Sequence, residues 1–123
     1  MRDLRWEATQ KSAQKLLTAI DGNVRLTKGS GAVKGNGDVI SDAFMVECKF
    51  RSNKNFVVKI DELIKVTEEA DLIGRSAFMY IENKAGQAIV AMEPSVFSHA
   101  IHAAFAEGMK HASKQNSSST SPV

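Results

Sequence analysis

The run FMVECKFR, residues 44–51, constrains the fold more than any other segment, because it alternates apolar and polar side chains with the period of a β-strand. Successive side chains on a strand point to opposite faces of its sheet. One face receives an apolar row that is expected to meet the core, namely Phe44, Val46, Cys48 and Phe50. The other face receives Met45, Glu47, Lys49 and Arg51. The segment with the strongest β signal is therefore expected to hold charged side chains on one face of the sheet.

Hydrophobic periodicity along the rest of the chain predicts an α/β fold. Helical spacing predicts helices over residues 5–20, from Ile60 to near Gly74, and from Pro94 onward. Short β-prone runs predict strands at 38–41, 44–51, 55–58, 77–82 and 87–92, the last two forming a hairpin. The third helix is expected to carry an apolar side consisting of Phe97, Ile101, Ala104, Phe105 and Gly108. The expected order is a helix, three strands, a helix, two strands and a final helix.

Length and composition indicate one domain with one core. A chain of 123 residues has the size of a single domain, which we place at residues 1–112. The Ser-rich segment 113–123 is expected to be a disordered tail. No apolar run approaches the roughly 20 residues of a membrane-spanning helix, so no membrane partner is expected. The single cysteine, Cys48, excludes an internal disulfide and favours a reducing cytoplasm.

Charge is distributed unevenly along the chain. Residues 1–60 hold 11 Lys/Arg against 6 Asp/Glu, a net charge of +5, whereas residues 61–123 hold 5 against 8, a net charge of −3. The basic half contains the Gly-rich loop TKGSGAVKGNG, residues 27–37, which has neither the P-loop spacing nor the dinucleotide-binding spacing. Basic side chains gathered in this way favour a polyanionic partner, because Lys and Arg contacts to phosphates release counterions.

A pair of carboxylates is expected beside the strand of residues 44–51. If the preceding strand folds back through a two-residue turn at Asp42, then Asp38 lies opposite Glu47, and Lys49 shares the face of Glu47. Like charges directly opposite each other destabilise a sheet, so a hard cation such as Mg²⁺ would explain the pair. The alternative is that Asp38 is a turn residue and that Glu47 and Lys49 form a solvated strand face.

The motif GNGD, which ends at Asp38, and the motif FMVECKF, which contains Glu47 and Lys49, resemble the PD-(D/E)xK nuclease superfamily. With the element order, a glutamate in the first helix and the GSG loop, the chain resembles the archaeal-type Holliday junction resolvases and their phage or bacterial relatives over residues 4–92. The resemblance implies a restriction-endonuclease-like αβββαβ core, with a mixed central sheet flanked by helices. Residues 1–112 would then be a single nuclease domain.

The motif departs from the family pattern at two points. Asn36-Gly37 stands where the family has a proline before its aspartate, and the spacing from Asp38 to Glu47 is short. These departures leave Asp42 as a rival for the metal-binding aspartate. Asp42 lies in the predicted turn, however, where no partner is expected for it.

The resemblance also implies roles for individual residues. The metal, Mg²⁺ with Mn²⁺ as a substitute, would be held by Asp38, Glu47 and Glu7, while Lys49 and the loop residue Ser30 would complete the catalytic set. The alternatives are a surface pair of Glu7 with Lys11 and ordinary loop chemistry for Ser30. Contacts to the DNA backbone are expected from Lys28, Lys34, Arg51 and Lys54, each of which taken alone fits a solvated surface equally well.

The implied function is metal-dependent, structure-selective hydrolysis of DNA phosphodiesters by a Holliday junction resolvase, in the cytoplasm of a bacterial, phage-infected or archaeal cell. The alternatives are a nuclease for other branched, nicked or single-stranded DNA and a non-catalytic nucleic-acid binding module. A homodimer is expected, because a two-fold junction needs two symmetric cuts. The surfaces expected to form the dimer are the hairpin and the Ala-rich face of the third helix, which contains Ala100, Ala103 and Ala104.

Overall fold

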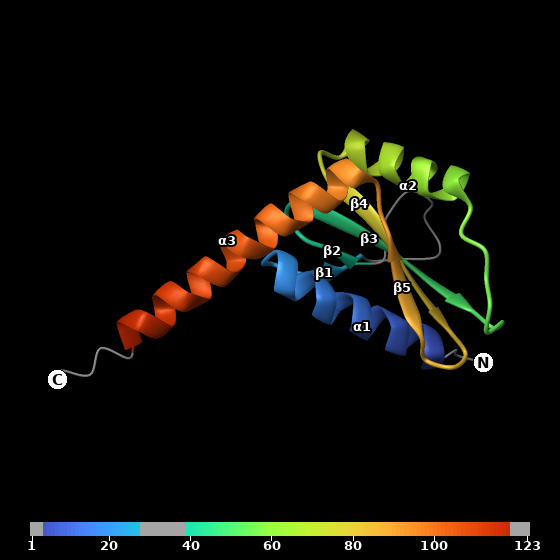
Figure 1. Cartoon of the computed structure of the whole chain (residues 1–123), viewed down its shortest axis with the longest axis horizontal. Coiled ribbons are helices and arrows are strands. Elements are labelled where there is room, and N and C mark those ends of the chain that lie inside the picture. The colour runs from blue at the N-terminus through green and yellow to red at the C-terminus, as the bar shows by residue number, and fades with distance from the viewer. Residues whose placement is uncertain (1–3, 28–38, 119–123) are drawn as a thin grey trace.

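The computed structural model describes residues 4–27 and 39–118, which form three helices and five strands (Figure 1). In chain order they are α1 (Leu4–Ile20), β1 (Arg25–Leu26), β2 (Val39–Ile40), β3 (Phe44–Arg51), α2 (Ile60–Leu72), β4 (Ser76–Asn83), β5 (Ala88–Ala91) and α3 (Pro94–Ser118). The fold class predicted from the sequence, α/β, is confirmed. None of the helices in these described ranges combines the length and the hydropathy of a membrane-spanning segment.

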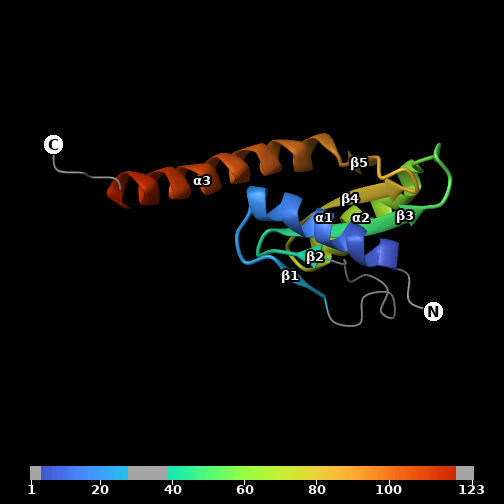
Figure 2. The same cartoon turned by 90° about the horizontal axis from the view of Figure 1, so that it is seen from below.

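The five strands form one open mixed sheet in the order β1-β2-β3-β4-β5. Neighbouring strands are antiparallel except for the central pair, β3 and β4, which runs parallel over the full length of both strands. A parallel pair needs a crossover connection, and α2 supplies it. The helices α1 and α2 lie on opposite sides of the sheet (Figure 1), and α3 runs beside α1 (Figure 2). The strand with the predicted charged row is therefore central and not at an edge.

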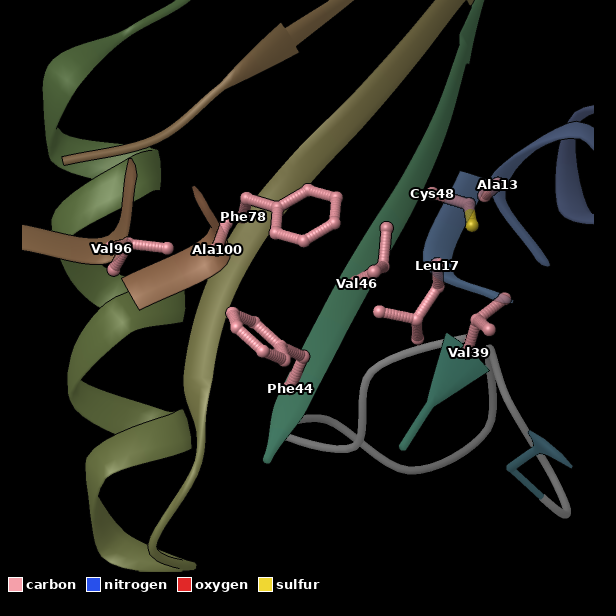
Figure 3. Close-up of a cluster of buried hydrophobic side chains, with 9 residues drawn as sticks. All are labelled: Ala13, Leu17, Val39, Phe44, Val46, Cys48, Phe78, Val96 and Ala100. Atoms are coloured by element: carbon pink, nitrogen blue, oxygen red, sulfur yellow. The ribbon is translucent and has the colours of Figure 1, made fainter. Parts of the chain in front are cut away.

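Two apolar clusters hold the layers together. The larger cluster lies between the sheet and the helices α1 and α3 (Figure 3), and consists of Ala13, Leu17, Val39, Phe44, Val46, Cys48, Phe78, Val96 and Ala100. The smaller cluster joins the other face of the sheet to α2 through Met45, Val66, Ala70 and Ala77. The predicted apolar row of β3 is confirmed as a core row for its first three members, and its last member, Phe50, is half-buried.

A fixed turn sets the register between β2 and β3. Val39 lies opposite Val46 and Ile40 opposite Met45, which is the predicted pairing. The amide of Ser41 donates to the carbonyl of Phe44 over 2.9 Å and closes the two-residue turn. The carboxylate of Asp21, at the end of α1, accepts hydrogen bonds from the Ser41 hydroxyl at 2.8 Å and from the Ala43 amide at 3.1 Å. Because a slip of one residue would break all of these bonds and turn the buried row outward, the pairing is strongly specified.

The prediction of a strand at residues 55–58 was wrong. This segment is an irregular connection from β3 to α2, and Val57 within it is 78% exposed. Its β-branched residues carry local β propensity, but no strand within residues 4–27 and 39–118 pairs with them, and propensity without a partner does not make a strand. The third strand of the first half is instead β1, which follows Asn23 in the left-handed conformation at φ 57° and pairs with β2. Two residues are too few to give a periodic signal.

The third helix orients its side chains differently from the expectation. Its small residues face inward: Ala100 is buried, and Ala103 and Ala104 are half-buried. The large residues expected on one apolar side, Phe97, Ile101 and Phe105, point outward. The Ala-rich face therefore packs on the body of the same chain, and its predicted use as a dimer surface was wrong. Small inward residues let α3 approach the sheet and α1 closely, which leaves the bulky residues no room on that side.

The third helix also continues beyond the predicted domain boundary. It extends to Ser118, past residue 112, so helix covers the first part of the segment that was predicted to be a disordered tail. Its C-terminal part projects away from the sheet (Figure 1). The residues from 119 to 123 lie outside the described chain, and for them the expectation of a tail stays a prediction.

Candidate metal and phosphate site

The side chains of Glu47 and Lys49 lie together on one face of β3. The Nζ atom of Lys49 is 3.8 Å from Oε1 of Glu47, and the two side chains are 29% and 25% exposed, respectively. Residues two apart on a strand share a face, which explains the contact. An ion pair that is about three-quarters covered is screened less by water than a fully exposed one. The pair thus offers one carboxylate and one ammonium group at a position still open to solvent.

Buried neighbours hold this pair in place. Glu47 lies opposite Met79 and Lys49 opposite Ile81 in the parallel β3–β4 ladder, and both of these β4 residues are buried. One pleat earlier on the same face, Met45 is fully buried beneath α2. The two charged groups therefore lie at the border of an apolar layer, where the lower local dielectric strengthens their interaction with a further charged group.

A second ion pair continues the charged face. Arg51 Nη2 lies 3.8 Å from Glu62 Oε2 on α2, with side chains 36% and 38% exposed. The face that holds Glu47 and Lys49 therefore also carries a basic group that is already paired within the protein. Lys54, in the exposed connection after β3, is held by its backbone, whose carbonyl accepts a hydrogen bond from Asn83 Nδ2 at 2.7 Å. Both predicted DNA contacts within the described chain thus lie beyond Lys49 at the same end of the strand.

Glu7 lies in the first turn of α1 and is half-buried. The helix covers the face of the sheet opposite to the row of Glu47, as its contacts with Val46 and Cys48 show. Two residues after Glu7, the Thr9 hydroxyl donates to Oε2 of Glu82 at 3.3 Å. Glu82 is near the end of β4, so Glu7 and Lys49 belong to the same end of the sheet.

Asp42, the rival for the metal-binding aspartate, is not isolated as the sequence predicted. Its carboxylate accepts a hydrogen bond from Asn23 Nδ2 at 3.1 Å and lies 3.5 Å from Arg25 Nη1. The hydrogen bond from Asn23 and the positive charge of Arg25 hold the pKa of Asp42 below its usual value. This carboxylate lies in the turn before β3, and its partners are Asn23, just before β1, and Arg25, the first residue of β1. Its surroundings explain its presence without a metal.

Several predicted site residues lie outside the described residues, namely Lys28, Ser30, Lys34 and Asp38. Within residues 4–27 and 39–118, no three His, Cys, Asp or Glu side chains are grouped so that they could hold a metal ion. The carboxylate of Glu47 lies at a partly open position, and carboxylate oxygen is a ligand that suits a hard cation. Mg²⁺ uses one or two carboxylates together with water and substrate phosphate, so a single described carboxylate fits this ion as a partial ligand set.

Three residues that the sequence reasoning missed help to build this region. Asn83 is 3% exposed, and its Oδ1 accepts hydrogen bonds from the amides of Ala85 and Gln87 at 3.0 and 2.9 Å. It thereby joins the β4–β5 turn to the connection after β3. Asparagine before a Lys-Ala-Gly turn is a recognisable signal for this role. Glu62, the partner of Arg51, and Asp21, which fixes the β2–β3 turn, give no sequence signal of their own because their partners are distant in the chain.

Comparison with protein-family models, with curated proteins and with solved structures finds no match to this chain.

Proposed function

We propose that this protein is a metal-dependent, structure-selective DNA endonuclease, and that it acts on four-way junctions as a Holliday junction resolvase. The observation that carries the proposal is the contact of Glu47 with Lys49 on one face of the central strand. A carboxylate and a lysine two residues apart, about three-quarters covered and beside a buried layer, provide a ligand for a hard cation and a donor for phosphate oxygen.

The topology supports the same proposal. The order of a helix, three strands, a helix and further strands, with an antiparallel β2–β3 pair and a parallel β3–β4 pair, agrees with the restriction-endonuclease-like core that the motif resemblance implies. The observed β2–β3 register adds a second argument. If the pairing of Val39 with Val46 continued by one residue, Asp38 would lie opposite Glu47. Two carboxylates would then share the site, and a cation would relieve their repulsion.

The proposed mechanism is hydrolysis of a phosphodiester. Water attacks phosphorus, the bond from phosphorus to one sugar oxygen breaks, and the proton of the water ends on the leaving oxygen. Glu47 and Asp38 would hold Mg²⁺ or Mn²⁺. Glu7, the third candidate ligand, would have to reach the ion around the end of the sheet, because α1 covers the face opposite to Glu47. When bound, such an ion supplies Lewis-acid chemistry to the reacting phosphate.

Lys49 has the role of stabilising charge. Its ammonium group would donate to a non-bridging phosphate oxygen, or to the attacking water, as negative charge develops on phosphorus. Because Glu47 holds the ammonium group at 3.8 Å, Lys49 is oriented before substrate arrives. Arg51, Lys54, Lys28 and Lys34 would contact the DNA backbone, and Ser30 is proposed to complete the site from the Gly-rich loop.

A cleavage assay tests the proposal. Labelled four-way, forked, duplex and single-stranded DNA are incubated with the protein and either Mg²⁺ or Ca²⁺. We expect Mg²⁺-dependent nicks, with the four-way junction cut fastest, and we expect Glu47→Gln to lower the rate by about two orders of magnitude or more. The matched control is Glu62→Gln, which makes the same chemical change on the same face, at a carboxylate that pairs with Arg51.

Each outcome of the assay is informative. Equal rates for Glu47→Gln and the parent chain would refute the site. Faster cutting of forks or single strands than of junctions would support the nuclease assignment and rule out the resolvase assignment. Binding of DNA without any cleavage would favour a non-catalytic binding module.

A thermal shift tests metal binding independently of cleavage. Mg²⁺ should raise Tm, because a ligand that binds only the folded state stabilises it, and Asp38→Asn should remove the rise.

A further inference from the structure

The outer side of α3 carries a stripe of four large apolar residues at intervals of four. Phe97 is 56%, Ile101 51%, Phe105 70% and Met109 56% exposed. An α-helix turns by about 100° per residue, so Phe105 lies about 140° and Met109 about 180° around the helix from the buried residue Ala100. A surface helix normally presents its large apolar residues to the core. This helix does the reverse, and its outer side requires another explanation.

The segment that contains the first three stripe residues lacks charge. Between Glu93 and Glu107 the chain contains no Asp, Glu, Lys or Arg, although half of the circumference of the helix faces outward. The polar residues there are two serines and two histidines. A helix that lies on a membrane surface typically carries Lys and Arg on its polar side, which this segment does not. Depletion of charge together with large apolar residues is instead the composition of the centre of a protein–protein interface.

The body of the chain supports α3 on one side only. Val96 and Ala100 join the cluster on the sheet, and Glu107 lies against Gly22 at the end of α1, where a Cβ added to Gly22 would be 3.5 Å from the glutamate Oε1. Beyond this point the helix projects from the domain (Figure 1 and Figure 2). None of the four stripe residues belongs to either apolar cluster, and the stripe winds slowly around the helix, by about 40° from one residue to the next.

We propose that this stripe is the contact between two copies of the chain, formed by α3 of one copy crossing α3 of the other about a two-fold axis. Phe97, Ile101, Phe105 and Met109 form one i±4 ridge of the helix. Two such ridges fit into each other's grooves at a crossing angle of about −50°, which is the commonest helix packing in globular proteins. A surface that fits itself is what an isologous dimer needs, and the lack of charge removes repulsion between identical helices.

The size of the stripe agrees with a dimer. A whole aromatic side chain buries about 150–250 Å², so the exposed fractions of the four residues correspond to about 400 Å² of apolar surface in each copy. Two copies would supply about 800 Å², near half of the roughly 1,600 Å² total of a standard interface. Such interfaces are only a little more than half apolar, so the flanking residues Ser98, His102 and Ala106 can supply the remainder.

The consequence for cleavage rests on the proposed function, whereas the contact itself rests only on α3. A two-fold dimer would carry two Glu47–Lys49 sites in one particle, and paired incision of a junction would follow. The dimer and the chemistry can be measured separately. The nuclease proposal fails if Glu47→Gln cuts DNA as fast as the parent does. The dimer proposal fails if the parent chain sediments with the mass of a monomer, whatever its activity.

The test is sedimentation velocity on the full chain from 1 to about 100 µM. We expect a dimer of twice the chain mass at about 10 µM, and we expect Phe105→Glu to raise the dimer Kd by at least about 30-fold, as for a central interface residue. The matched control is Leu72→Glu, which introduces the same charge at a residue that is 87% exposed on α2. This control should remain dimeric, and so should Phe105→Leu, which keeps an apolar side chain. Circular dichroism establishes that each variant is folded.

Three results would overturn the proposal. The first is a parent chain that is monomeric at 100 µM, and the second is a folded Phe105→Glu variant that dimerises like the parent. The third is an equal loss of dimer in Leu72→Glu. Flotation with vesicles of neutral and anionic lipid is measured in parallel, and vesicle binding by a monomeric parent through Phe105 would assign the stripe to a membrane and reject the dimer. If the parent is a nuclease, the Phe105→Glu variant should nick one strand of a four-way junction at a time and should no longer make two nicks within the lifetime of one complex.

Discussion

Phe44, Met45 and Val46, at the start of β3, are fully buried on both faces of the sheet, whereas Glu47, Lys49 and Arg51 follow within a few residues and hold ion pairs at partly open positions. Both halves have the same strand conformation and pair with β4 along their whole length, whereas β2 pairs only with Met45 and Val46 in the first half. The halves also differ in what covers their faces. Helices α1, α2 and α3 cover the first half, and the row of Glu47 lies beyond the buried contact of Met45 with α2.

This difference separates stability from chemistry along one strand. Burial in the first half fixes the strand in register and contributes most of its stabilisation, because apolar surface is removed from water on both faces. The buried first half also fixes the position of the second half, which can therefore hold charged groups. We expect substitutions in the first half to change folding and substitutions in the second half to change reactivity.

The largest effect is expected at Phe44. Its ring lies 6.3 Å from that of Phe78 and 4.6 Å from that of His99, centroid to centroid, and its side chain is fully buried. Phe44→Ala should lower the free energy of unfolding by about 3–5 kcal/mol, through lost burial and the cavity that remains. Urea denaturation measures the change. Arg51→Ala, on the same strand, is the control and should cost less than about 1 kcal/mol. Similar losses in the free energy of unfolding for the two variants would contradict the distinction between the two halves of β3.

The second effect is expected at Lys49 and should appear in the rate. Lys49→Ala should slow cleavage by about 100-fold, equivalent to about 2.7 kcal/mol of transition-state stabilisation, because an ammonium group is lost where charge develops. Its pair with Glu47 is partly exposed, so the free energy of unfolding should change by less than about 1 kcal/mol. Quenched-flow cleavage with Mg²⁺ and a gel shift with Ca²⁺ measure the two properties. Parallel loss of binding and cleavage would make Lys49 a phosphate contact.

The smallest effect is expected at Asp42, the carboxylate in the turn before β3. Its folded pKa is lowered by Asn23 and Arg25, so its contribution to stability is present above its ordinary pKa, near 3.8, and is lost as the pH falls through the lower folded value. Asp42→Asn should therefore lower Tm slightly at neutral pH, where this contribution is present, and leave Tm unchanged at the lowest pH, so that the acid dependence of Tm below about pH 4 becomes flatter. Cleavage should be unchanged. A loss of cleavage like that of Glu47→Gln would transfer the metal-ligand role to Asp42.

Much of the architecture could be predicted because local patterns and tertiary packing agree. The first two helices end near Asp21 and Gly74 as expected, and Gly74 has the positive φ of 71° that favours glycine after a helix. The pairing of Val39 with Val46 followed from a two-residue turn and an alternating pattern. The position of Glu47 beside Lys49 follows from strand alternation alone.

The failures have physical causes that lie outside local pattern. Val57 and its neighbours favour extended structure, but a strand also needs a partner, and none of the five described strands pairs with this segment. On α3, a hydrophobic pattern marks an apolar side without stating what it contacts. The large residue Phe105 faces outward because small residues such as Ala100 allow the closer approach on the inner side. The partners of Asp42 and Arg51 come from distant segments, and pairwise spacing within one strand does not reveal them.

The parallel pairing of β3 with β4 also determines the order in which the chain can assemble. Residues 52–75 separate the two strands, so the centre of the sheet forms only after a long loop has closed, which is the slow kind of contact in folding. The β2–β3 hairpin emerges from a ribosome well before β4, and an isolated two-stranded hairpin is marginally stable in water. During synthesis the strand that contains Glu47 and Lys49 therefore lacks its parallel neighbour until Ser76–Asn83 has emerged.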